Sequence, residues 1–215
     1  MIRPEKILSC SMCGNILSAV CGQGVMQIIP YGENLLHFVY YPDCNTASSK
    51  LPEAETLPMW GIDAEPEILP ALKEKGNLIY FGVPQLGAVL NREDAGVKFT
   101  NAEGCELLSL IDCIMEPVVV LGEKTYHIRV IFSASEDERY YGLGQHQDGK
   151  LDLGGREQIL WHDYSHKGGE IVAVPFLVTN KKYGIIFDNP SRMKVTPGVD
   201  GSTVWQAEVG EAVSF

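Results

Sequence analysis

Apolar and polar residues alternate along much of this 215-residue chain. Residues 125–132 (TYHIRVIF) place aromatic and aliphatic side chains on one face and His127 and Arg129 on the other, as in a half-buried antiparallel strand. Similar patterns predict strands over residues 15–20, 25–29, 35–41, 78–81, 107–111, 174–179, 184–188 and 203–209. Many short strands separated by short turns are typical of a β-sandwich, so we predict an all-β antiparallel sandwich.

Turn and helix signals refine this picture. Glycine-containing turns are predicted at residues 21–24, 31–34, 101–104 and 197–201. Residues 179–184 suit a tight hairpin in which Gly184 is free to take a positive φ. Residues 66–75 could form a turn or two of helix, interrupted by Pro70, and the S-x-x-E capping box at Ser135 predicts one short turn through Arg139 and Tyr140. Without a repeat or a low-complexity linker, residues 1–215 are expected to form a single domain.

Composition and charge narrow the possible partners. Hydrophobic residues make up 45% of the chain, enough for a sizeable core. The net charge of −11 disfavours nucleic acid and anionic membranes, whereas a neutral sugar is compatible with it. No apolar run is long enough to span a membrane. The N-terminus does not resemble an export signal, so we expect a cytoplasmic protein with reduced cysteines.

Two groups of residues resemble metal sites. Cys10 and Cys13 have the spacing of a zinc knuckle, but a second pair is missing. His146, His162 and His166 lie close in sequence to several aspartates, yet the glycines at 168 and 169 disfavour the helix that would bring the last two histidines onto one face. A solvated polar loop is the preferred interpretation, and no metal or other cofactor is expected.

The remaining polar motifs do not form a catalytic site by themselves. Gly142 and Gly144 form a G-x-G pattern without the third glycine and following helix of a phosphate-binding loop, so backbone geometry explains them better. Asp152, Asp163 and Glu170 lie in a glycine-rich loop that cannot hold two carboxyl groups at the fixed separation that hydrolysis by a carboxyl pair needs. We therefore assign no catalytic residue.

An ordered set of segments resembles the N-terminal β-domain of glycoside hydrolase family 31, the α-glucosidases and α-xylosidases. The segments are ERYYGLGQHQ at 138–147, LDLGG at 151–155, Trp161-His162-Asp163, Pro175-Phe176 and Tyr183-Gly184-Ile185. Residues 35–43 resemble an early strand of the same domain.

The resemblance implies a galactose-mutarotase-like sandwich packed on a (β/α)8 barrel that would follow Phe215. In this family two barrel aspartates cleave the α-linked glycoside with retention, and neither would lie in this chain. The loop between Gln145 and Pro175 resembles one that reaches over the barrel mouth, where Asp163 would contact the sugar. His162, His146 and Trp161 would lie nearby, and Trp161 could stack on a pyranose ring or serve as a core or interface anchor.

Substrate and role remain open between alternatives. His146-Gln147 looks closer to the xyloside-cleaving branch, which often lacks the loop aspartate, so α-xyloside and α-glucoside are both retained. The leading hypothesis is an accessory domain, inactive alone, of a longer glycosidase. The apolar ending at residues 211–215 suggests that more polypeptide follows. The alternatives are an aldose epimerase-like domain and a free-standing carbohydrate-binding module.

Overall fold

The computed structural model describes residues 1–43, 69–146, 149–161 and 172–215. Within these ranges the secondary structure consists of β-strands and turns, which confirms the all-β class. The chain divides into two compact units, residues 1–111 with 212–214 and residues 112–211 with Phe215. No helix among the described residues is long and apolar enough to cross a membrane.

The first unit contains a five-stranded sheet in the order β1-β2-β3-β4-β17. Its strands are β1 (Ile7–Cys13), β2 (Ile16–Cys21), β3 (Val25–Gly32), β4 (Leu35–Tyr41) and β17 (Val213–Ser214). Short turns join the first four strands into an antiparallel meander, and β17 pairs with the free edge of β4 through Val213 opposite Tyr40. The two-residue strand β17 thus pairs with the edge of β4 at Val39 and Tyr40 and shields its backbone there.

The second sheet of this unit is made by β5 to β8 and the start of β9. These strands are β5 (Ala71–Lys75), β6 (Leu78–Gly82), β7 (Leu86–Asn91), β8 (Val97–Asn101) and β9 (Glu106–Val120). They pair antiparallel in chain order, so each hairpin fixes the register of the next strand. β4 contacts β7, and inward side chains such as Phe38, Phe81 and Leu90 form a fully buried core.

Strands β3 and β4 are buried on both faces, which is unusual for an antiparallel sheet in a small unit. One face carries Phe38 and the other a separate apolar cluster of Val25, Ile29, Tyr31, Val39 and Tyr41. His37 lies on the cluster's face, opposite Ile29, with 8% of its surface exposed. A titratable ring is therefore enclosed among apolar side chains.

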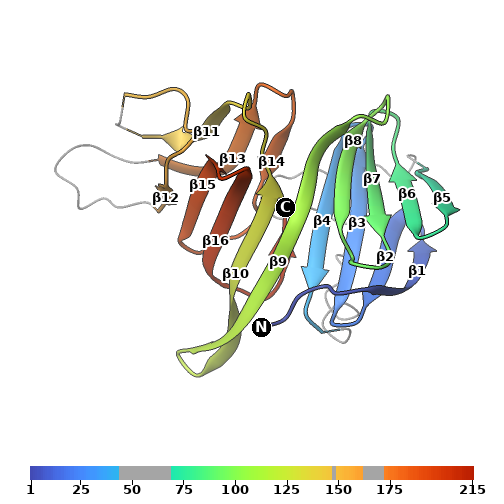
Figure 1. The fold of residues 1–215 in the computed structure, drawn as a ribbon. Coiled ribbons are helices and arrows are strands. Elements are labelled where there is room, and N and C mark those ends of the chain that lie inside the picture. Colours follow the sequence, from blue (N-terminus) through green and yellow to red (C-terminus); the bar gives the residue numbers. More distant parts are fainter. Residues whose placement is uncertain (44–68, 147–148, 162–171) are drawn as a thin grey trace. The chain divides into compact units, whose positions relative to one another are not determined.

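The second unit contains the rest of β9 and seven further strands. They are β10 (Glu123–Ser133), β11 (Tyr140–Gln145), β12 (Gln158–Leu160), β13 (Val172–Thr179), β14 (Gly184–Ile186), β15 (Met193–Val199) and β16 (Ser202–Gly210). One sheet has the order β12-β15-β16-β10-β9, and a smaller sheet has the order β11-β13-β14 (Figure 1).

Aromatic rings form the centre of the second unit. Phe187 stacks on Trp205 with ring centroids 5.1 Å apart, and both side chains are fully buried. Phe215 meets Phe132 edge to face at 5.0 Å and lies parallel to Phe187 at 6.5 Å. The apolar character of residue 215 is thus accounted for by packing within this unit.

Most predicted strands are present, whereas the two predicted helical turns differ from the structure. The predicted strand at residues 35–41 is β4, and the alternation within 125–132 reappears as the buried and exposed sides of β10. The helical turn expected over residues 66–75 is instead the edge strand β5 from Ala71 onward, which pairs with β6 across a turn that needs the positive φ of Gly76. The capping box forms a single turn at Ser135, but Tyr140 already begins β11.

Candidate functional site

The Gly-Leu-Gly segment of β11 is a β-bulge pressed against β13. Gly142, Leu143 and Gly144 all have positive φ, and the pairing register shifts between the two glycines. A Cβ atom on Gly142 would lie 2.5 Å from the carbonyl oxygen of Phe176, and one on Gly144 would collide with the carbonyl of Val172. The two glycines therefore permit close backbone approach, as the geometric interpretation of the motif predicted.

The hairpin between β13 and β14 also departs from the prediction. Lys182, not Gly184, takes the positive φ of 66° in this turn. Gly184 is required for a different reason: a Cβ there would lie 2.6 Å from the ring of Phe176. The expectation of a positive φ at Gly184 was therefore wrong. Glycine is needed at this position because the Phe176 ring on the neighbouring strand leaves no room for a Cβ atom.

Glu138 ties the start of β11 to this hairpin. Its side chain is only 6% exposed, and Oε2 accepts a hydrogen bond from the Ser135 amide at 3.2 Å, completing the predicted capping box. Oε1 accepts a short hydrogen bond from the Tyr183 hydroxyl. Burial and the neighbouring Glu138 carboxylate together raise the pKa of Tyr183, so the phenol stays protonated as a donor.

Asp152 fastens the LDLGG segment to the same strand. Its Oδ1 accepts from the amides of Gly154 at 3.0 Å and Tyr140 at 3.2 Å, while Oδ2 lies 3.4 Å from Arg139 Nε. Burial opposes ionisation, but these amides and the positive charges of Arg139 and Arg156 outweigh it and lower the pKa of Asp152. Such a carboxylate is a structural acceptor that holds the start of β11 to the LDLGG segment.

These contacts enclose a polar pocket of about 300 Å³ that the sequence analysis missed. Its lining includes Glu138, Arg139, Tyr140, Asp152 and the glycine turns at 154–155 and 198–201. In the sequence, an acidic residue lies close to the glycines of each of these turns, and this was the available signal for the pocket. The carboxylates of Glu138 and Asp152 are already occupied by protein donors, so the pocket holds few free groups for binding.

Two of the four predicted sugar-contacting residues lie within the described ranges. Trp161 directly follows β12 and is 50% exposed, which rules out a core position. His146 directly follows β11, and its Nε2 donates a hydrogen bond to the Leu143 carbonyl at 2.9 Å. Both residues thus extend from strands that contact β13.

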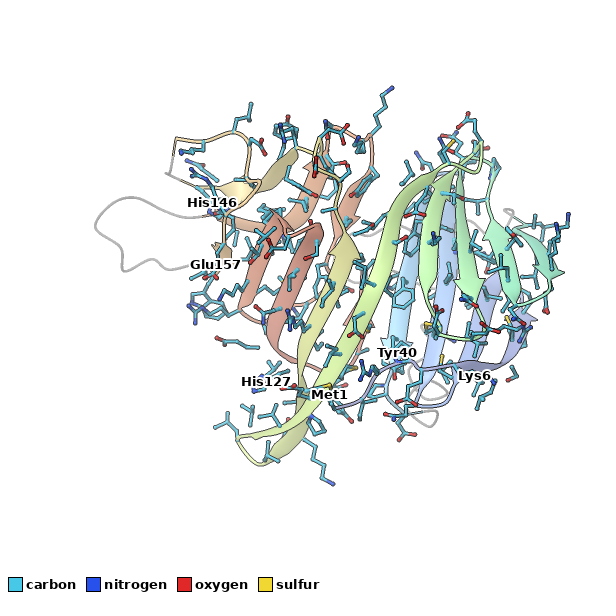
Figure 2. The ribbon with its side chains drawn as sticks, viewed as in Figure 1. Met1, Lys6, Tyr40, His127, His146 and Glu157 are labelled. Atoms are coloured by element: carbon cyan, nitrogen blue, oxygen red, sulfur yellow. The ribbon has the colours of Figure 1, made fainter. Side chains whose placement is uncertain are left out.

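The other two predicted residues, His162 and Asp163, lie outside the described residues. His166 and Glu170 lie outside them as well. Figure 2 shows His146 beyond the end of β11 and Glu157 just before β12, on the same side of the second unit in this view. Glu157 forms an ion pair with Lys194 at 2.6 Å, so the start of β12 is attached to β15 by a side chain as well as by its ladder.

Cys10, Cys13 and Cys105 are free thiols. Cys10 is half-buried on β1, and burial raises the pKa of its thiol, while Cys13 is exposed at the end of the same strand. Among the residues that the structure describes, no three histidine, cysteine, aspartate or glutamate side chains are grouped as metal ligands would be. The site is therefore built from hydrogen-bonded loops and an exposed aromatic ring.

Comparison with known proteins assigns the family. Residues 26–195 match the glycosyl hydrolase 31 N-terminal galactose mutarotase-like domain, and the chain belongs to this family. The fold is accordingly the galactose-mutarotase-like β-sandwich that the sequence predicted.

Several relatives are themselves glycosidases. The chain is 35% identical over 100 residues to an α-xylosidase of Saccharolobus solfataricus, a match that covers 42% of this chain and 13% of the relative. A dextranase of Flavobacterium johnsoniae, in complex with glucose, shares the fold at a TM-score of 0.77 and 17% identity, over 100% of this chain and 26% of that one. An α-xylosidase from a soil metagenome, in complex with xylose, gives a TM-score of 0.76 at 23% identity, over 96% and 31%.

The matched region is a minor part of each curated relative. The chain spans about a third of the length of one family 31 glucosidase, from Pseudescherichia vulneris, and less of the Saccharolobus protein. The domain seen here is thus one component of longer enzymes in the relatives that it matches.

Proposed function

We propose that this chain is the N-terminal accessory domain of a retaining α-glycosidase. In this proposal it supports a (β/α)8 barrel and contributes residues 145–175 to the sugar-binding site. The observation that carries the proposal is the match of residues 26–195 to the family's N-terminal domain, combined with its small share of the relatives' length. The exposed indole of Trp161 supports a sugar-facing role for this loop.

An α-xyloside is the substrate that we propose first. The relative with 35% identity is named an α-xylosidase, and one similar structure is an α-xylosidase in complex with xylose. An α-glucoside is the alternative, because the Pseudescherichia relative is named a glucosidase. Asp163, His162 and His146 are proposed to bind the sugar together with Trp161.

Activity assays on two proteins test the proposal. The 215-residue chain alone should hydrolyse neither p-nitrophenyl α-xyloside nor p-nitrophenyl α-glucoside, because in this proposal the barrel supplies the pair of carboxyl groups that hydrolysis requires. The protein expressed from the whole gene should cleave one of them. Turnover by the purified chain, or mutarotation of glucose, galactose or xylose followed by polarimetry, would overturn the accessory role and favour a catalytic domain.

We also propose a cytoplasmic location. Cys10, Cys13 and Cys105 carry free thiols, which supports a reducing compartment. A disulfide-linked peptide in a non-reducing digest of the protein purified from its own cells would contradict this.

A further inference from the structure

The β9–β10 hairpin carries an exposed apolar tip. The last residue of β10 paired with β16 is Tyr126, opposite Gly210, so the hairpin continues beyond the end of that strand (Figure 1). Val119 and Val120 at the end of β9 are 65% and 40% exposed, and Leu121 in the turn is fully exposed. We refer to Val119, Val120 and Leu121 as the hairpin tip.

The backbone of the hairpin tip adopts a conformation that is unfavourable for leucine. Leu121 has a φ of 52° and Gly122 a φ of 87°, so both residues of the two-residue turn are left-handed, as in a type I′ turn. Asparagine, aspartate or glycine is strongly preferred at the first of these positions, and a leucine there is strained. Because Leu121 is fully exposed, no packing within the chain offsets this cost. A residue that is unfavourable in its local backbone conformation, and whose cost no packing within the chain offsets, indicates a functional contact.

The charge around the tip restricts the kind of partner. Glu116 on one strand and Glu123 and Lys124 on the other flank it and are all exposed, and the whole chain carries a net charge of −11. Nucleic acid or an anionic lipid surface would be repelled, and two copies of the chain would bring acidic surfaces together. An uncharged recess on another polypeptide surface fits an exposed Val-Val-Leu sequence.

We propose that the hairpin tip inserts into an apolar recess of the polypeptide that accompanies this domain in family 31 enzymes. This inference rests on the proposed function and names the surface through which the domain is held. We infer that this polypeptide is the partner because every relative compared above contains this domain within a chain at least three times as long as the matched segment. A leucine anchor at the centre of such a contact would contribute roughly 10- to 100-fold in affinity.

The variant Leu121→Asn separates docking from folding. Asparagine tolerates the left-handed conformation, so the thermal midpoint of the 215-residue chain should stay unchanged or rise by a few degrees. A leucine with a purely structural role would instead lower the midpoint when replaced. Leu8→Asn, at another exposed leucine (61%) on β1, is the matched control for the loss of an exposed apolar side chain.

Binding is measured by calorimetry between the 215-residue chain and the separately expressed polypeptide encoded after Phe215 in the same gene. Wild type and Leu8→Asn should bind alike, and Leu121→Asn at least about tenfold more weakly. Equal binding by all three chains would overturn the tip as anchor but leave the proposed function intact. A gene without such a polypeptide, or one whose product does not bind the wild-type chain, would overturn both. Self-association of the wild type that Leu121→Asn abolishes, seen by sedimentation, would assign the tip to a second copy instead.

Discussion

His37 should make the stability of the first unit depend on pH in a range where few other groups titrate. The ring is enclosed by the apolar cluster on one face of β3 and β4, with the Tyr31 ring 5.8 Å away. Nε2 is 2.8 Å from the Ser214 hydroxyl, and Nδ1 has no hydrogen-bond partner among the described residues. Burial without a compensating charge lowers the pKa of His37 from 6.5 to about 4, because the protonated ring would lose its hydration.

The sign and size of the effect follow from this difference in pKa. In the unfolded chain His37 takes up a proton as the pH falls through 6.5, whereas in the folded chain it stays neutral until about pH 4. Proton uptake therefore favours the unfolded state between these values, and the stability contributed by neutral burial is lost as the pH falls. A difference of about 2.5 in pKa corresponds to about 3 kcal/mol in full, of which about 2 kcal/mol is lost between pH 7.5 and 5.0.

The variant His37→Gln tests this reasoning, because an amide can still meet Ser214 but does not titrate. We expect the free energy of unfolding of the wild type, from urea titrations followed by far-UV circular dichroism, to fall about 2 kcal/mol more than that of the variant between pH 7.5 and 5.0. Hydrogen exchange of the β3 and β4 amides would locate the change in the first unit. His127→Gln, at an exposed histidine on β10, should keep the wild-type pH dependence. Parallel curves for wild type and His37→Gln would refute the argument.

Three further predictions test the site and its scaffold. Gly144→Ala should destabilise the chain by roughly 3 kcal/mol, because the added Cβ atom collides with β13 and the positive φ is strained. The control Gly149→Ala has a positive φ but open space around it, so it should cost about 1 kcal/mol. Equal losses of stability in urea unfolding would contradict the close-approach argument. Tyr183→Phe removes the donor to the buried Glu138 carboxylate and should cost about 1–3 kcal/mol in the same measurement, and no change would mean that water replaces the phenol. Trp161→Ala should leave stability within about 1 kcal/mol and raise the KM of the longer enzyme several-fold, while an unchanged KM would remove this residue from the sugar site.

Strands with strong alternation could be predicted because one face had to be buried. β4 was predicted with its correct bounds, since Leu35–Tyr41 is bounded by turn residues on both sides and is rich in aromatic and aliphatic residues. β5 could not be predicted in this way. Its sequence ALKEK favours helix, and all five residues are exposed, so only backbone pairing with β6 makes it a strand. Long-range pairing of this kind leaves no local pattern.

The candidate site shows the same division between local and distant causes. The need for glycine at 142 and 144 was predicted from the missing helix and third glycine, although the cause, the carbonyls of β13, lies some thirty residues away in sequence. The role of Gly184 was misassigned because the adjacent turn suggested a positive φ, while the constraint comes from the Phe176 ring on the paired strand. The binding roles of Asp163, His162, His146 and Trp161 stay predictions, since they depend on a family resemblance and not on residue patterns.

The short strand β17 has a practical consequence for anyone who shortens this protein. Val213 is fully buried, and its strand supplies the hydrogen bonds that close the outer side of β4. A version that stops before Ala212 would leave a hydrophobic strand with bare amides and carbonyls, which is a template for intermolecular β-pairing and precipitation. Recombinant pieces of related enzymes should therefore be cut downstream of the residue equivalent to Phe215, even where the preceding sheet looks complete.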